Sequence, residues 1–252
     1  MAVTIALYLK VWNVRDGLDR LAALYLHNDR FLDAAIRMLD KGLSNSPDDA
    51  GLYDRRALAS ALTDSWDVAE ADWARHRQLA PRSVRPLISQ GWAHLRRKRP
   101  GEAATAFEEA VEQSKKERWA IAGLGIARLR LGDAGQAVEA FKRLQGKTLV
   151  DGSPTDGHDA LTLTYLAEAQ LALGDNDLAI ATASNAIEEF DSFHGRTWLA
   201  RADAHVRLGD IDAAAKDYNS ALLASDEIVV EDRAIAGLEA INRVVSEDEP
   251  DW

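Results

Sequence analysis

The chain has few side chains arranged for catalysis. Its six histidines are scattered without a His-x-x-x-His pair, it has no cysteine, and neither a Gly-x-Ser-x-Gly motif nor a Walker lysine occurs. Gly123-Leu-Gly125 lies in a helical pattern without a strand before it, so it does not indicate a phosphate loop. We therefore expect that the protein is not an enzyme and needs no cofactor.

One stretch of the chain could hold a cation. Asp151, Asp156, His158 and Asp159 lie in a Gly- and Asp-rich segment, residues 145–159. Their spacing does not match a calcium-binding loop, so we predict a solvated loop and no metal site.

The most pronounced local charge is positive. Between Trp73 and Gly101 there is no Asp or Glu, although the segment contains many basic residues. The Arg-Arg-Lys-Arg-Pro run can end a helix, whose C-terminal dipole favours cations, and this is the interpretation we prefer. The alternative is a dock for an acidic partner or, less favoured, for nucleic acid. The residues of this possible basic dock are Arg75, Arg77, Arg97, Lys98 and Arg99.

The overall composition is that of a folded protein with an acidic surface. Of 252 residues, 47% are hydrophobic and 28% charged, and the net charge of −11 argues against general nucleic-acid binding. No apolar run reaches the ~18 residues of a membrane span, and no basic residue precedes the apolar N-terminus as a signal peptide requires. We predict a cytoplasmic protein, or a domain of a longer chain. Abundant Ala and Arg indicate a bacterial genome.

The helical elements around these residues recur along the chain. Leu-Gly-Asp occurs at 131–133, 173–175 and 208–210, each time with Ala five residues after the Gly. The same small residue is found six times, at intervals of 34, 34, 34, 42 and 35. The six positions are Ala35, Ala69, Ala103, Ala137, Ala179 and Ala214. Four residues after them come Leu39, Trp73, Phe107, Phe141, Ala183 and Tyr218. Twelve residues before them come Ala23, Ala57, Gly91, Gly125, Ala167 and Ala202.

This register resembles the tetratricopeptide repeat, a pair of antiparallel helices that recurs every 34 residues. The resemblance implies an all-α fold, a right-handed superhelical solenoid of antiparallel helix pairs. Gly or Ala is expected where two helices cross closely. The Gly of Leu-Gly-Asp is expected in a left-handed conformation that ends the first helix, and the Asp after it can cap the second helix.

The resemblance also predicts the organisation of the chain. Six repeats occupy residues 17–228, with a loop insertion at about 145–159. Residues 1–16 are predicted to be an N-terminal capping segment, with a dimer contact or the stub of an anchor as alternatives. Residues 229–245 are predicted to be a C-terminal capping helix, and residues 246–252 an acidic tail.

By the geometry of the family, defined positions of each first helix face a concave groove. In the third and fourth repeats these positions carry apolar residues and two tryptophans, with arginines at the rim. Such residues often anchor partners, although the tryptophans could equally pack between neighbouring first helices. In the second repeat, Asp54 and Leu58 are expected to face the groove. The candidate partner-binding residues are Arg85, Ile88, Trp92, Leu95, Arg96, Trp119, Ile126 and Arg130.

The predicted function is therefore protein–protein interaction, as a scaffold or adaptor that binds a peptide segment or partner protein in the groove. The partner is expected to present an apolar segment with acidic flanks; the acidic tail of the chain itself could be such a segment, so self-association is possible. One alternative is a regulatory or substrate-recruiting domain of a larger protein or enzyme. The other is a self-assembling structural protein.

Overall fold

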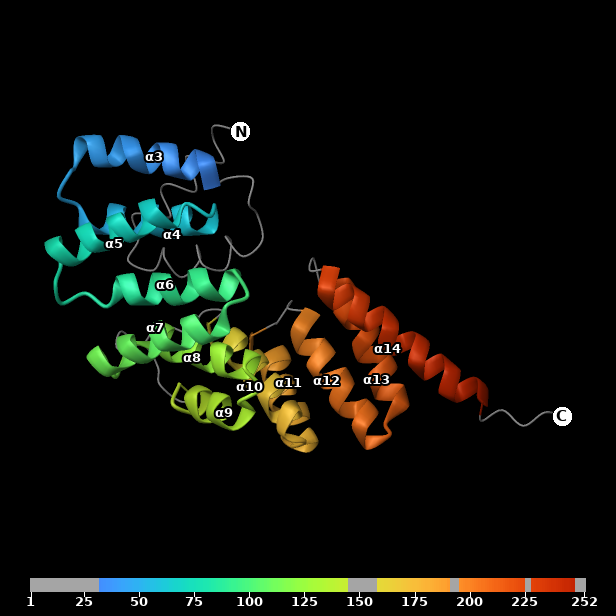
Figure 1. Cartoon of the computed structure of the whole chain (residues 1–252). Coiled ribbons are helices and arrows are strands. Elements are labelled where there is room, and N and C mark those ends of the chain that lie inside the picture. The colour runs from blue at the N-terminus through green and yellow to red at the C-terminus, as the bar shows by residue number, and fades with distance from the viewer. Residues whose placement is uncertain (1–31, 145–157, 191–194, 225–227, 248–252) are drawn as a thin grey trace. The chain divides into compact units, whose positions relative to one another are not determined.

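The computed structural model describes residues 32–144, 158–190, 195–224 and 228–247, and this part of the chain contains twelve helices and no strand. Figure 1 shows the helices in chain order, from α3 in blue to α14 in red. Their bounds are α3 Leu32–Asn45, α4 Ala50–Leu62, α5 Trp66–Leu79, α6 Arg85–Arg96, α7 Pro100–Gln113, α8 Arg118–Arg130, α9 Ala134–Lys142, α10 His158–Leu173, α11 Asn176–Phe190, α12 Gly195–Leu208, α13 Ile211–Ala224 and α14 Ile228–Glu247.

The chain divides into two compact units, residues 1–123 and 124–252, with the division inside α8. In the first unit, α4 packs on α5 and α6 on α7, and α4 also contacts α6. In the second unit, α10 packs on α11 and α12 on α13, while α12 also contacts α10, α11 and α14. In these pairs each helix packs on its partner, and α4, α10 and α12 also contact a helix of the next element pair. The predicted all-α superhelical repeat fold is confirmed.

The turns within the repeats follow the sequence pattern. Gly132, Gly174 and Gly209 have φ values of 87°, 86° and 80°, so the predicted left-handed residue ends the first helix in each case. The predicted cap is present at Asp210, whose Oδ1 accepts a hydrogen bond from the backbone N–H of Ala213 at 3.2 Å. The prediction of a cap is wrong for Asp133, whose side chain makes no capping hydrogen bond to α9 and instead pairs with Arg128.

Two repeats of the first unit make the same turn without glycine. Asp64 and Lys98, which lie 68 and 34 residues before Gly132, have φ values of 64° and 56°. A side chain in this left-handed region costs conformational energy, because its Cβ approaches the following carbonyl oxygen. The first unit therefore carries local strain at two turns that the second unit avoids.

Large aromatic rings fill the space left by small residues of neighbouring helices. The ring of Phe107 in α7 is fully buried and lies so close to Gly91 in α6 and Gly123 in α8 that a Cβ there would come within 2.6 and 2.3 Å of it. In the second unit the ring of Phe141 fills the place of a side chain at Gly125, and a Cβ at that glycine would lie 2.6 Å from it. The predicted close helix crossings are therefore present.

Some of the predicted segments lie outside the described residues. These are the N-terminal capping segment 1–16, the first helix of the first repeat up to residue 31, the loop insertion over residues 145–157 and the end of the acidic tail, residues 248–252. Helix α14 spans Ile228–Glu247, so it includes two residues that the sequence interpretation placed in the tail.

Replacing Lys98 by glycine should stabilise the protein. The Lys98→Gly variant removes the left-handed strain, so we expect the free energy of unfolding to rise by about 0.5–1 kcal/mol in a denaturant titration. Lys98→Ala removes the same charge but keeps the strain. Equal stability of the two variants would contradict the strain at this turn.

Adding a methyl group at Gly123 should destabilise the protein, because the buried ring of Phe107 cannot move away without loss of packing. We expect Gly123→Ala to lower the free energy of unfolding by about 1–3 kcal/mol. Gly101→Ala is the matched control, since a Cβ at that helical position meets nothing within 4 Å. It should be neutral or stabilising by up to about 1 kcal/mol, through helix propensity alone. A similar loss in both variants would show that the helix crossing is not tight.

Candidate functional site

Two tryptophans of the first unit form a half-buried aromatic corner. Trp92 comes from the middle of α6 and Trp119 from the first turn of α8. Their ring centroids lie 6.3 Å apart at an interplanar angle of 66°, and Trp92 also meets Phe107 edge-on with centroids 5.5 Å apart. The Trp92 ring is thus packed against the buried ring of Phe107 on one side and against Trp119 on another.

The other candidate partner-binding residues differ in exposure. In the first unit, Ile88 and the arginines Arg85 and Arg96 are partly exposed on α6, whereas Leu95 is buried. In the second unit, Ile126 is buried and Arg130 is exposed. The structure thus places Trp92 beside Trp119 and three further candidates on the same helix. Leu95 and Ile126 offer little surface to a partner.

Two arginines of the basic segment pair with acidic residues from outside it. Arg75 pairs with Asp48 at 3.0 Å (Nη2 to Oδ1), and Arg97 pairs with Asp64. The guanidinium carbon of Arg99 lies 5.8 Å from the ring centroid of Trp66, in a cation–π arrangement. The two remaining members of the possible basic dock, Arg77 and Lys98, are exposed.

Asp54, which the sequence places toward the groove, is fully buried, and Leu58 beside it is also in the core. Neither carboxyl oxygen of Asp54 has a hydrogen-bond partner. Burial raises the pKa of this carboxyl. The nearby Ser89 hydroxyl, without forming a well-aligned hydrogen bond, lowers it in part, as do the charges of His76, Arg85 and Arg55.

His76 provides a second buried polar group near Asp54. Its Nδ1 lies 2.7 Å from the carbonyl oxygen of Ala50. Because a carbonyl oxygen only accepts, Nδ1 carries the proton and donates a hydrogen bond to this carbonyl. Its Nε2 is buried and has no hydrogen-bond partner. Asp54 in α4 and His76 in α5 thus each carry buried polar atoms without a hydrogen-bond partner.

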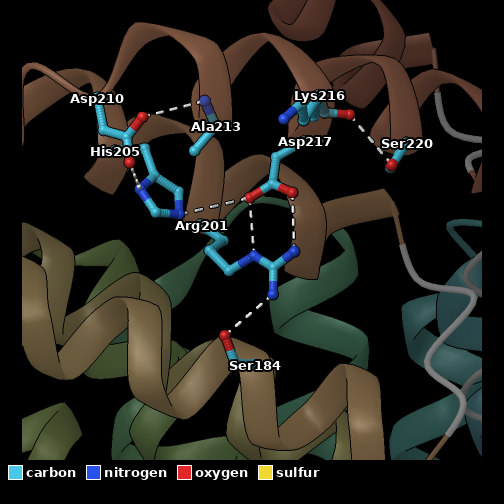
Figure 2. Close-up of polar contacts among 8 residues, drawn as sticks. All are labelled: Ser184, Arg201, His205, Asp210, Ala213, Lys216, Asp217 and Ser220. Atoms are coloured by element: carbon cyan, nitrogen blue, oxygen red, sulfur yellow. Dashed lines mark hydrogen bonds and ion pairs between the residues drawn. The ribbon is translucent and has the colours of Figure 1, made fainter.

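A polar network in the second unit was not anticipated from the sequence (Figure 2). Arg201 in α12 makes a two-pronged contact with Asp217 in α13, from Nε to Oδ2 at 2.7 Å and from Nη2 to Oδ1 at 2.8 Å. Its Nη1 donates to the Ser184 hydroxyl in α11 at 2.9 Å. His205 lies between two carboxylates, 3.7 Å from Asp210 and 3.9 Å from Asp217.

The first unit contains a counterpart of this network. Arg56 in α4 contacts Asp72 in α5 through Nε and Nη2, both at 2.7 Å, and its Nη1 donates to Asp40 in α3 at 2.7 Å. In both networks an arginine of the first helix holds its own second helix and the second helix of the preceding repeat. The signal in the sequence is an Arg followed by an Asp sixteen residues later, at 56/72 and 201/217.

Helix α14 is tied to the last repeat by one carboxylate. Asp203 in α12 accepts hydrogen bonds from the Tyr218 hydroxyl at 2.7 Å and from Nη2 of Arg233 at 2.6 Å. Burial and then this hydrogen bond raise the pKa of Tyr218. Each of these polar groups has a structural partner on another helix, so the networks hold helices together.

His94 lies stacked on Trp66, with ring centroids 4.9 Å apart, so it has a packing role. Among the possible loop ligands, Asp151 and Asp156 lie outside the described residues. Within the described part of the chain, no three His, Asp or Glu residues are grouped so that they could hold a metal ion. None of the helices described is long and apolar enough to cross a membrane.

The sequence matches the family model of the tetratricopeptide repeat at residues 65–118, 88–154 and 165–227, together more than half of the chain. No curated protein matches it.

Solved structures of repeat proteins have a similar fold. The crystal structure of the APC/C hetero-tetramer Cut9–Hcn1 is similar with a TM-score of 0.69 and 18% identity, over 92% of this chain and 46% of that one. Yeast Tom70 has a TM-score of 0.67 and 15% identity, over 85% of this chain and 44% of its own. YrrB, described as having an unusual peptide-binding site, has a TM-score of 0.56 and 15% identity, over 81% and 97%. The chain spans less than half the length of the first two.

The burial of Asp54 should make stability depend on pH. The raised pKa means that the folded protein keeps its proton at pH values where the unfolded chain has lost it, so the free energy of unfolding falls as pH rises above the ordinary pKa of Asp. Asp54→Asn mimics the protonated form. We expect it to match the wild type at about pH 4 and to be increasingly more stable toward about pH 8.

The measurement is urea unfolding at several pH values. The exposed Asp67→Asn variant is the control, and it should follow the wild-type pH dependence. If the stability of Asp54→Asn shows the same pH dependence as the wild type, burial does not control the ionisation of Asp54.

Proposed function

Because the chain belongs to the tetratricopeptide repeat family, we propose that it is a protein-interaction scaffold that binds a segment of a partner protein on the α6 and α8 surface of the first unit. The observation that carries this proposal is the aromatic corner of Trp92 and Trp119, with arginines on the same helix as Trp92. Peptide binding is a described property of YrrB, which has a similar fold. We propose no catalytic step.

The corner has the properties of a binding anchor. Both rings are only partly buried, although each could bury more apolar area than most other side chains. Trp92 is already held in place by Phe107, so little conformational entropy is lost when a partner covers it. An apolar side chain of the partner would lie in the angle between the two rings, next to Ile88.

The charges around the corner define the flanks of the segment. Arg85 and Arg96 lie eleven residues apart on α6, on either side of Trp92 in the sequence. A guanidinium binds a carboxylate with two parallel hydrogen bonds, and such charge-assisted bonds orient as well as attract. We therefore propose an apolar segment with Asp or Glu on its flanks. The net charge of −11 makes such a positive surface the exception on this chain, which disfavours binding of acidic segments elsewhere.

The test measures binding of a labelled peptide with an apolar centre and acidic flanks, by fluorescence anisotropy. We expect Trp92→Ala/Trp119→Ala to weaken binding more than about tenfold, because aromatic anchors dominate interface energies. Trp198→Ala, in the second unit, is the control for the loss of a tryptophan. Circular dichroism must show that each variant remains folded.

A second pair of variants keeps the core intact. Arg85→Gln/Arg96→Gln should weaken binding and reduce its salt dependence, whereas Arg77→Gln/Arg82→Gln removes the same charge from exposed positions and should have little effect. Equal effects of the two pairs, or unchanged binding by the tryptophan pair, would place the site on another surface. In a separate pull-down from a cell lysate with the protein as bait, recovery of only the protein itself would favour self-assembly instead.

A further inference from the structure

The second unit carries a group of exposed leucines at the turns inside its last two repeats. Leu173 ends α10, Leu208 ends α12, and Leu178 lies in the first turn of α11; their exposed fractions are 48%, 49% and 56%. Single exposed leucines are common on protein surfaces, but several together indicate an interaction site.

Contacts between the two repeats place these turns side by side. Arg207, which precedes Leu208, donates a hydrogen bond from Nη1 to the carbonyl oxygen of Leu171, two residues before Leu173. Beneath them, Leu171 packs with Ala179 of α11 and Ala204 of α12. The ends of α10 and α12 and the start of α11 therefore form one continuous surface.

Exposed aspartates lie next to these leucines in the sequence. Asp175 and Asp177 flank the start of α11, and Asp210 and Asp212 flank the start of α13. Asp210 caps α13 and lies near His205, and Asp177 and Asp212 complement the dipoles of their helices from the first turn, where their carboxylates remain exposed. We call the surface formed by Leu173, Leu178, Leu208, Asp175, Asp177, Asp210 and Asp212 the leucine–aspartate edge.

The equivalent turns of the second, third and fourth repeats lack this combination. The residue before the left-handed position is Thr63 in the second repeat and Arg97 in the third. The fourth repeat has Leu131, but its Asp133 is paired with Arg128 at 3.4 Å. The combination of apolar and unneutralised acidic side chains is thus specific to the last two repeats among those described.

We propose that the leucine–aspartate edge binds a basic amphipathic helix of a partner protein, separately from the tryptophan corner. Charge complementarity selects this occupant. The leucines would contact apolar side chains of the helix, and the aspartates beside them would attract its Lys or Arg residues. The same aspartates repel anionic membranes and nucleic acids.

The spacing of the repeats suits a helix laid along the edge. Helices in contact, such as α10 and α12, have axes about 8–10 Å apart. Residues i and i+7 on one face of a helix are separated by about 10.5 Å along its axis. Apolar residues at this spacing can therefore reach Leu173 and Leu208 together, while basic residues beside them meet the aspartates.

The experiment uses the full chain and a labelled model peptide of about 18 residues, built from Leu and Lys with Leu at i, i+3, i+4 and i+7. We expect wild type to bind it in fluorescence anisotropy, and Leu173→Ser/Leu208→Ser to bind about tenfold more weakly. Leu223→Ser is the matched control, since Leu223 is a 90% exposed leucine of α13 away from the edge, and it should bind like wild type.

Charge is tested in the same way. Asp175→Asn/Asp177→Asn should weaken binding, and Glu139→Gln/Glu188→Gln, which removes the same charge elsewhere on the second unit, should not. All four substituted acidic residues are exposed, so both charge variants should remain folded. Absence of binding by wild type would overturn the proposal. So would an equal loss in the edge variants and their controls, because binding would then be a general attraction to an acidic chain.

Binding of the basic peptide at the leucine–aspartate edge is independent of the proposed binding at α6 and α8. The Trp92→Ala/Trp119→Ala variant should therefore bind the basic peptide like wild type. Loss of basic-peptide binding in this variant would contradict a separate edge, while loss of acidic-peptide binding alone leaves the edge proposal standing.

Discussion

The close fit of one aromatic ring against glycines of neighbouring helices is the contact on which the repeats of the first unit depend. The ring of Phe107 occupies the volume that side chains at Gly91 and Gly123 would need, so α7 reaches both the first helix of its own repeat and that of the next. Phe141 against Gly125 and Tyr218 against Gly237 repeat this arrangement in the second unit. Because protein interiors are close-packed, this fit determines how near the helices come.

Polar contacts add specificity to this apolar frame at particular repeats. Arg56 and Arg201 each hold a carboxylate of their own repeat in a bidentate contact and reach into the preceding second helix. At the same places, the repeats between them carry Gln90, Leu124 and Leu166. The polar clamps therefore do not hold every repeat, and the aromatic and small-residue contacts must suffice in the middle of the array.

Surface chemistry differs between the two units, and this difference leads to two separate binding proposals. The first unit combines a half-buried tryptophan corner with arginines in an otherwise acidic protein. The second combines half-exposed leucines with aspartates at its turns. Under the two proposals, the opposite charges around the tryptophan corner and the leucine–aspartate edge would let one chain distinguish acidic from basic partner segments, since like charges disfavour the wrong one.

The sequence by itself determined the repeat length, the all-α fold and the left-handed turn glycines, because these depend on local spacing and on the steric limits of single residues. It also placed Trp92 and Trp119 in equivalent first helices. Only the tertiary structure decided that Leu95 and Ile126 are buried, that Asp54 lacks hydrogen-bond partners, and that Asp48 and Asp64 neutralise part of the basic segment. Burial and pairing depend on residues far apart in the chain, so the periodic pattern that identifies a helix face does not reveal what covers it.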